Sequence, residues 1–281
     1  MATSAMAVPA DDPDGLELEL LLEAVHRRYG LDFRGYANAS LRRRVWRRVT
    51  LEGLETVTAL TDRILHDPRV LERLLKDLSI NVTEMFRDPS FHAALRDAAI
   101  PLLRTYPFVR IWNAGCSTGE EAFSLAILLQ EAGLLDRSRI YATDMNEGAL
   151  AQARTGAFPL ERMQTYTENY QQAGGTRSFS EYYVARGSSA LFDPALARNT
   201  VFAQHNLVSD RSFNEFHLIV CRNVMIYFGR ELQRHVHELF LDSLVPLGLL
   251  GLGRKEAISP PEIAARYQPL VASEKLFRRR S

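Results

Sequence analysis

The stretch VRIWNAGCSTGEEAFSLA, from Val109 to Ala126, decides the fold of this chain. An apolar run that ends in a Gly/Ser/Thr turn and continues as an amphipathic pattern is typical of a strand, a tight turn and a helix. A second strand is predicted at Arg139–Thr143, and Asp144 closes it. In doubly wound α/β folds an acidic residue about 25 positions after the glycine turn accepts the hydroxyls of a ribose. The pattern therefore indicates a nucleotide-like ligand.

The glycine turn also narrows the choice of ligand. It lacks the Gly-Lys-Ser/Thr ending of a phosphate-binding loop, and Gly115 and Gly119 do not have the dinucleotide spacing. We therefore expect a ligand that carries a ribose but no pyrophosphate. S-adenosylmethionine, with S-adenosylhomocysteine as its spent form, meets that description.

The composition is that of a globular protein. The chain has 281 residues, of which 46% are hydrophobic and 24% charged, enough for a core and for two units. Lys plus Arg equals Asp plus Glu at 34 each, so no global field attracts nucleic acid. Cys116 and Cys221 are expected to be small buried side chains, and no metal site is expected. Because no secretory leader or membrane-spanning run is evident, a reduced cytoplasmic protein that does not insert into membranes is predicted.

Apolar periodicity divides the chain into a tail, a helical unit and an α/β unit. Residues 1–15 are predicted to be a disordered tail, and residues 16–79 a helical domain whose first helix steps along Leu16 and Leu20. In residues 80–281 strands alternate with helices, which predicts a mostly parallel sheet covered on both faces, with a small antiparallel β-subdomain inserted at about 164–198. Beyond the first two strands, we expect strands at Thr200–Gln204, His217–Cys221 and Leu247–Leu252, and helices at Glu120–Glu131, Glu147–Arg154 and Arg230–Leu244.

The helical unit carries an unusual basic run, LRRRVWRRV, from Leu41 to Val49. Residues four apart share one side of a helix, so the arginines are predicted to form a stripe opposite Leu41 and Val45. Such a stripe suits an acidic partner. It equally fits a solvated helix face that nearby acids such as Glu52 and Glu55 neutralise. The residues of the stripe are Arg42, Arg43, Arg44, Arg47 and Arg48.

The junction between the units, SINVTEMFRDPSF, spans Ser79 to Phe91. A turn entering a helix would bring Asn81, Thr83 and Arg87 to one side, with Met85 and Phe86 directed elsewhere. The alternative is capping, in which Asn81 or Thr83 caps a helix and Asp88-Pro89 opens the next.

Several motifs in order give the chain a resemblance to the CheR family, the S-adenosylmethionine-dependent protein-glutamate O-methyltransferases of bacterial chemotaxis. The similarity extends from about Leu21 to Gly253. The motifs are N-x-T-x-x-x-R at Asn81–Arg87, AGCSTGEE at Ala114–Glu121, ATDMN at Ala142–Asn146, HNL at His205–Leu207 and CRNVMIYF at Cys221–Phe228.

The resemblance implies a helical N-terminal domain, a Rossmann-like methyltransferase domain and an inserted β-subdomain. It implies that Arg87 and Tyr227 face the reacting methyl group, and that the basic helix, through Arg43, Arg44, Arg47 and Arg48, docks the receptor. The implied partner is a methyl-accepting chemoreceptor or a receptor-like helical protein with an acidic methylation region, and a monomer is expected. The implied cofactor-binding residues are Asn81, Thr83, Arg87, Gly115, Glu121, Asp144, Asn206, Leu207, Asn223 and Val224.

The implied chemistry makes few demands on the protein. A glutamate side chain has a pKa near 4.3, so it is an ionised nucleophile at neutral pH and needs no general base. Alignment and exclusion of water are then the main contributions that the protein makes. We expect Arg87 to steer the carboxylate or support the cofactor. Tyr227 either positions a carboxylate oxygen or only packs.

The sequence also departs from the family. It reads LGLGRKEAI after the fifth strand, where relatives resemble L-F-x-G-H-S-E, and the β-subdomain interval lacks the glycine-bearing pattern of members that bind a tethering peptide. Docking through a tethered peptide is therefore not expected. Two alternatives remain at this stage: a methyltransferase for small-molecule carboxyl or hydroxyl groups, and a non-enzymatic signalling module that binds the cofactor.

Overall fold

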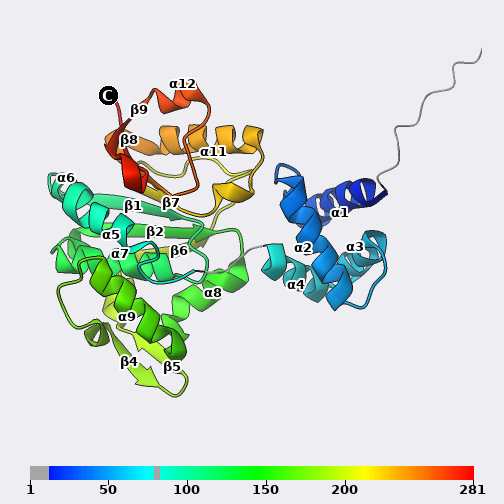
Figure 1. The fold of residues 1–281 in the computed structure, drawn as a ribbon, viewed down its shortest axis with the longest axis horizontal. Coiled ribbons are helices and arrows are strands. Elements are labelled where there is room, and N and C mark those ends of the chain that lie inside the picture. Colours follow the sequence, from blue (N-terminus) through cyan, green and yellow to red (C-terminus); the bar gives the residue numbers. More distant parts are fainter. Residues whose placement is uncertain (1–12, 79–82) are drawn as a thin grey trace, which may run out of the picture. The chain divides into compact units, whose positions relative to one another are not determined.

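The chain forms two compact units, Met1–Ile80 and Asn81–Ser281 (Figure 1). The computed structural model describes residues 13–78 and 83–281 of them. Most of the expected tail, and Asn81 of the junction, lie outside the described residues. No helix in the described ranges is both long enough and apolar enough to cross a membrane.

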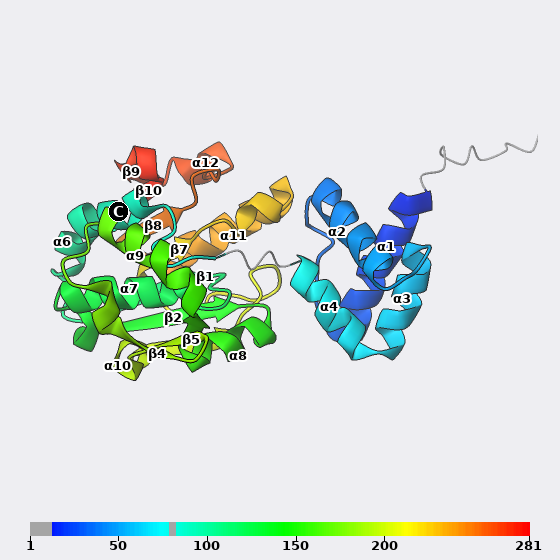
Figure 2. The same cartoon turned by 60° about the horizontal axis from the view of Figure 1, so that its bottom comes forward.

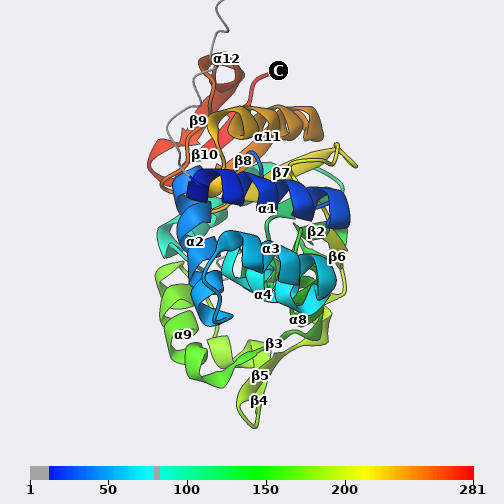
Figure 3. The same ribbon diagram turned by 90° about the vertical axis from the view of Figure 1, so that its right-hand side faces the viewer.

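The N-terminal unit is a bundle of helices drawn in blue to cyan in Figure 3. Thr56 caps the third helix by accepting a hydrogen bond from the Ala59 amide. Leu21, Leu60 and Ile64 are fully buried between the helices. The helices are α1 (Pro13–Tyr29), α2 (Asn38–Leu51), α3 (Val57–His66) and α4 (Pro68–Leu78).

The first helix differs from the prediction in its start and in its buried face. It begins at Pro13, inside the expected tail of residues 1–15. Leu16 and Leu20, expected to face the core, are 60% and 56% exposed. The run GLELELLLEAV contains two series of leucines on different sides of the helix. Only one series is continued by a large apolar residue one turn later, Val25, and this series is the buried one. The buried series is Leu18, Leu21, Leu22 and Val25.

The second unit contains a seven-stranded sheet within residues 83–281, in the order β6-β2-β1-β7-β8-β10-β9. Five of its strands run parallel, and β10 pairs antiparallel with both β8 and β9. The predicted fold class is confirmed. The strands are β1 (Val109–Ala114), β2 (Ser138–Asp144), β6 (Thr200–Gln204), β7 (Phe216–Cys221), β8 (Leu244–Leu252), β9 (Tyr267–Val271) and β10 (Leu276–Arg279).

Helices cover both faces of this sheet, and successive residues of β1 point to opposite faces. Ile111 packs into the core that includes residues of α7, whereas Trp112 contacts Phe240 of α11, with their ring centroids 5.4 Å apart. In Figure 1, α11 lies on the opposite side of the strands from α9. The helices are α5 (Pro89–Ala94), α6 (Ile100–Leu103), α7 (Glu120–Glu131), α8 (Glu147–Thr155), α11 (Arg230–Ser243) and α12 (Pro261–Ala264), with a π-helical segment, Leu95–Ala99, joining α5 to α6.

A small three-stranded antiparallel sheet, order β3-β5-β4, forms the inserted subdomain (Figure 2). The insertion begins at Ala157, earlier than the expected 164, because its first strand is only three residues long and shows no alternation. The buried carboxylate of Glu131, at the end of α7, accepts hydrogen bonds from the hydroxyls of Tyr170 and Tyr182 and pairs with Arg96. The elements are β3 (Ala157–Pro159), α9 (Met163–Gln172), β4 (Tyr183–Arg186), β5 (Ser189–Phe192) and α10 (Pro194–Ala197).

Candidate functional site

The candidate site lies at the carboxyl ends of the parallel strands. The strand order β6-β2-β1-β7 reverses direction between β1 and β7, and ligands of open α/β sheets bind at such a switch point. Gly115 follows β1, Asp144 ends β2, Asn206 follows β6 and Asn223 follows β7. The topology therefore brings these residues, which were singled out from the sequence, to one edge of the sheet.

The turn after β1 needs glycine at position 115. Gly115 has φ +78°, a conformation that strains other residues. A Cβ built there would lie 2.4 Å from Cγ2 of Val224. The amides of Gly115 and Cys116 both donate to the Thr143 carbonyl, 2.8 and 2.9 Å away. The backbone at Gly115 therefore packs directly against Val224, in the turn after β7.

Asp144 presents a carboxylate at the end of β2. Its Oδ2 accepts from the Ser117 amide and its Oδ1 from the Asn146 amide, each at 2.9 Å. Burial raises the pKa of Asp144, while these amide bonds act in the opposite direction. A carboxylate has about four acceptor positions, and the amides of Ser117, Met145 and Asn146 occupy three of them, so the carboxylate retains capacity for a hydroxyl donor such as that of a ribose.

A buried arginine that the sequence analysis did not assign joins the elements of the site. The side chain of Arg222 is 2% exposed and lies 4.2 Å from the centroid of the Phe91 ring. Its Nη1 donates to Oε1 of Glu121 at 2.8 Å, and its Nη2 to Oδ2 of Asp88 at 2.6 Å. The other oxygen of Glu121 accepts from the Asn113 side chain at 2.8 Å. An arginine directly after an apolar strand, within CRNV, was the sequence signal for this bridge.

The segment that carries Thr83 and Arg87 is anchored by its apolar residues. Met85 and Phe86 are fully buried. The Phe86 amide donates to Oγ of Ser124 at 2.9 Å, and the Met85 carbonyl accepts from Asn169 at 3.1 Å. Thr83 and Arg87 are partly buried. No helix begins at Thr83, so the capping alternative does not hold for that residue.

Asp88 and Pro89 open the next helix, as the capping alternative expected, but the Asp88 side chain does not cap it. Asp88 precedes α5, and Pro89 is the first residue of that helix. The Asp88 carboxylate makes no capping hydrogen bond and instead pairs with Arg222. Asp88 has φ +52°, as does Phe86. Pairing with a buried cation therefore outweighs capping at this site.

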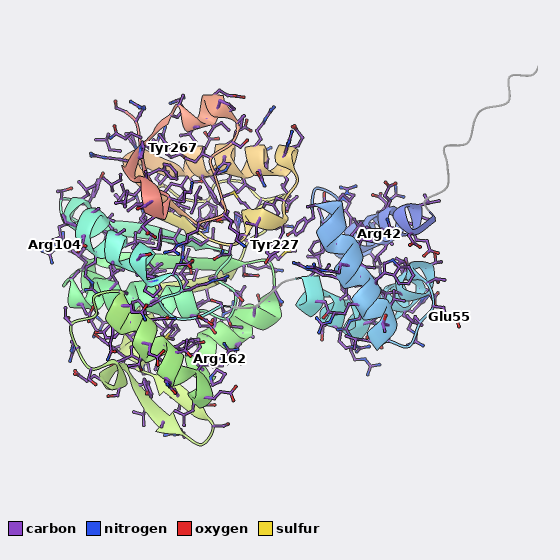
Figure 4. The ribbon with its side chains drawn as sticks, in the orientation of Figure 1. Arg42, Glu55, Arg104, Arg162, Tyr227 and Tyr267 are labelled. Atoms are coloured by element: carbon purple, nitrogen blue, oxygen red, sulfur yellow. The ribbon has the colours of Figure 1, made fainter. Side chains whose placement is uncertain are left out.

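Two further expected residues lie at the rim of the sheet. The side-chain oxygen of Asn206 accepts from the Val208 amide at 3.0 Å and so shapes the turn after β6, in which Leu207 is buried. Tyr227 lies in the short 3₁₀ helix Met225–Tyr227 after β7 and is partly buried (Figure 4).

The expected arginine stripe on α2 divides into two kinds of residue. Arg43 and Arg47 are exposed, whereas Arg44 and Arg48 are buried, so the expectation of a continuous docking stripe is wrong for the latter two. Arg44 donates to the carbonyl of Leu78. Helix α2 packs beside α3 and α4 in the bundle, and this turns one arginine pair inward.

The inward arginine pair is neutralised within the unit. Arg48 pairs with Asp77 at 2.5 Å and with Glu52 at 3.1 Å. Glu52 therefore neutralises Arg48 as the alternative expected, but Arg48 is buried and does not lie on a solvated face. The Arg48 and Arg73 guanidinium groups hold the pKa of Glu52 at about 2, with Arg73 the larger influence. Arg42, on α2, pairs with Asp14 at 2.9 Å, whereas Glu55 is exposed at the end of the following turn (Figure 4).

The sheet order, the bare glycine turn and the carboxylate at the end of β2 fit an S-adenosylmethionine-dependent methyltransferase, the class that the family comparison shows. The all-alpha domain of CheR methyltransferases matches residues 16–79, and their S-adenosylmethionine-binding domain matches residues 81–271. The chain belongs to the CheR methyltransferase family.

Relatives of known sequence agree with this assignment. The chain is 46% identical to the putative methyltransferase Cher3 of Pseudomonas putida, over 94% of this chain and 97% of that protein. It is 29% identical to a chemotaxis protein methyltransferase of Listeria innocua, over 84% of this chain and 88% of that protein. It is 28% identical to a chemotaxis protein methyltransferase of Salmonella typhimurium, over 91% of this chain and 89% of that protein.

Proposed function

We propose that this protein transfers a methyl group from S-adenosylmethionine to glutamate side chains of a chemoreceptor-type signalling protein and so forms glutamate methyl esters. The observation that carries the proposal is the match to both CheR domains, supported by relatives that are named chemotaxis protein methyltransferases. When bound, S-adenosylmethionine supplies an electrophilic methyl group on a sulfonium sulfur.

The carboxyl edge of the sheet offers suitable groups for this cofactor. Asp144 would accept the ribose hydroxyls with its remaining acceptor capacity. Glu121, held by Arg222 and Asn113, would accept from the amino group of the cofactor. The bare turn at Gly115 allows a close backbone approach. Asn206 and Leu207 would border the adenine, and Asn81, Thr83, Asn223 and Val224 would line the rest.

The acceptor side requires orientation rather than activation. The substrate carboxylate is ionised at neutral pH because its pKa is near 4.3, so no residue has to remove a proton from it. Arg87 would steer this anion, and the Tyr227 hydroxyl would donate a hydrogen bond to one of its oxygens. Both act by alignment, an effect that can supply about 7–11 kcal/mol when reactants are well oriented.

The N-terminal unit would recognise the receptor through Arg43 and Arg47. Both side chains are exposed, although Arg47 also pairs with Asp77 at 3.4 Å, and the buried arginines of the same helix have partners within the unit. Two exposed guanidinium groups one turn apart fit an acidic helical surface, such as the methylation region of a receptor.

A labelled-transfer assay tests the proposal. The protein is incubated with methyl-labelled S-adenosylmethionine and an extract that contains its cognate receptors. We expect label on protein that is released by mild base, as a glutamate methyl ester requires. Label in small molecules, or tight cofactor binding without any transfer, would contradict the proposal.

Charge reversal tests the docking surface. The double variant Arg43→Glu, Arg47→Glu should lower receptor methylation at least tenfold while leaving the Kd for S-adenosylhomocysteine unchanged. Arg27→Glu, at an exposed arginine of α1, is the matched control and should methylate like the wild type. A loss of cofactor affinity in the double variant would show that the α2 surface has another role.

A further inference from the structure

The loops that follow β7 and β8 meet at the carboxyl edge of the sheet. These strands are parallel neighbours, and Cys221 pairs in register with Leu252. The chain after Cys221 therefore runs beside the chain after Leu252. The first loop carries Asn223 and Val224, and the second carries Glu256.

The carboxylate of Glu256 binds the backbone of both loops. Glu256 is 5% exposed. Its Oε2 accepts from the amides of Gly253 at 2.6 Å and Asn223 at 3.1 Å. Its Oε1 accepts from the amides of Val224 at 2.9 Å and Met225 at 2.8 Å. Each oxygen is thus shared by two donors, and three consecutive amides of the first loop are directed at one side chain.

This contact involves a residue in the left-handed backbone conformation. Asn223 has φ +61°, in the region that asparagine adopts more readily than most residues other than glycine. The next residue, Val224, is the one that lies against the bare turn at Gly115. At position 253, a Cβ would lie 2.7 Å from Oε2 of Glu256 and 2.9 Å from the Asn223 nitrogen, so glycine permits the approach.

The negative charge is essential to the geometry. No salt bridge to Glu256 is present among residues 13–78 and 83–281, so aligned amide dipoles stabilise the carboxylate. Four amide donors need four acceptor positions, which an ionised carboxylate supplies. A glutamine would place its NH₂ group against two amides in either orientation, because each oxygen serves two of them.

We propose that Glu256 is a positioning residue for the methyl-donor site: its carboxylate holds the Asn223–Met225 backbone in the shape that presents Asn223 and Val224 to the cofactor. The inference rests on the proposed function, which assigns those two residues to the cofactor.

The test compares two substitutions at this position with a matched control. Glu256→Gln removes the charge at nearly constant volume, Glu256→Asp keeps the charge, and Glu262→Gln makes the same chemical change at an exposed glutamate of the same region. Calorimetry gives the Kd for S-adenosylhomocysteine. Amide hydrogen exchange of the ligand-free protein reports on residues 223–225.

We expect Glu256→Gln to raise the Kd at least tenfold and to accelerate exchange at residues 223–225 at least tenfold, with the other strands of the sheet protected as in the wild type. Glu256→Asp should lose less affinity, and Glu262→Gln should match the wild type. Wild-type affinity and exchange in Glu256→Gln, or equal losses in the Gln and Asp variants, would overturn the proposal.

Two further outcomes are also decisive. If Glu256→Gln does not fold, exchange in Glu256→Asp decides: faster exchange at residues 223–225 supports the role, and wild-type exchange overturns it. If the wild-type protein does not bind S-adenosylhomocysteine, the proposed function fails, while exchange in the ligand-free variants still tests the contact itself.

Discussion

Gly115 and Val224 lie so close together that a single added methyl group at position 115 would stand 2.4 Å from Cγ2 of Val224. The first residue follows β1 and the second follows β7, the two strands that flank the switch point of the sheet. The distance between these two turns is therefore set by the absence of a side chain at one residue.

Gly115→Ala should weaken cofactor binding by forcing the two turns apart. The variant combines backbone strain at φ +78° with a steric clash, and we expect the Kd for S-adenosylhomocysteine to rise at least tenfold by calorimetry. Gly133→Ala is the matched control, because Gly133 has φ +68° but nothing within 4 Å of the added carbon. Equal affinities in the two variants would show that the contact with Val224 does not shape the site.

Asp144→Asn should reduce cofactor affinity through the loss of charge-assisted hydrogen bonds. Hydrogen bonds to charged groups contribute about 1.5–3 kcal/mol, so we expect a rise in Kd of about 10- to 100-fold. Asp136→Asn, at a side chain that is 86% exposed, should bind like the wild type. A folded Asp144→Asn protein with unchanged Kd would remove Asp144 from the cofactor site.

Arg222→Met should destabilise the second unit. Removing the guanidinium leaves Asp88 and Glu121 without their shared buried partner. Breaking a buried ion pair from one side costs about 3–5 kcal/mol, measurable as a lower free energy of unfolding in urea. Arg198→Met, which removes an exposed pair with Asp136, should cost less than about 1 kcal/mol. Similar losses in both variants would mean that the buried bridge contributes little.

His237 should make the protein less stable in acid. Burial lowers the pKa of His237 to about 4, and its Nε2 donates to the Ala257 carbonyl. Between pH 6.5 and about 4 the unfolded chain takes up a proton that folded His237 does not, so the free energy of unfolding falls as the pH falls. At about 1.4 kcal/mol per pKa unit, the loss amounts to about 3 kcal/mol.

The test for His237 compares how the free energy of unfolding depends on pH in the wild type and in the variant His237→Gln. Burial also lowers the pKa of His92 and raises those of Glu120, Asp144 and Glu256, so the wild-type profile contains several contributions. His237→Gln keeps a donor for Ala257 and removes the titration. We expect the wild type to lose more stability than this variant between pH 6.5 and 4. Parallel profiles would show that His237 is protonated in the folded state as readily as in the unfolded one.

The central elements of the fold were predictable from the sequence because local patterns encode them. The prediction of Glu120–Glu131 as a helix is confirmed in full, and that of Arg139–Thr143 as a strand within one residue at each end. β9 and β10 were missed because they are short, and one contains Pro269 while the other ends in arginines. β9 is the edge strand of the sheet, where a proline is tolerated, whereas β10 lies between β8 and β9 and is too short to show a clear pattern.

The polar framework of the site was less predictable because tertiary contacts decide it. Nothing local distinguishes the buried Arg48 from the exposed Arg47, since their difference comes from packing against α4. Arg222 and Glu256 act on residues far away in the chain, and a single sequence does not reveal such pairs. Sequence motifs therefore indicated residues that line the site more readily than residues that hold the lining in place.

The Glu131 contacts have a consequence for which parts of the inserted subdomain tolerate change. Much of the polar attachment of the inserted subdomain passes through this one carboxylate, which also accepts from the amide and hydroxyl of Thr176. The exposed β4–β5 hairpin, with Gly187 at its tip, contributes none of these bonds. Substitutions at this exposed turn should therefore leave the polar attachment of the subdomain intact, whereas Ala190 and Phe192 of β5 belong to the buried core.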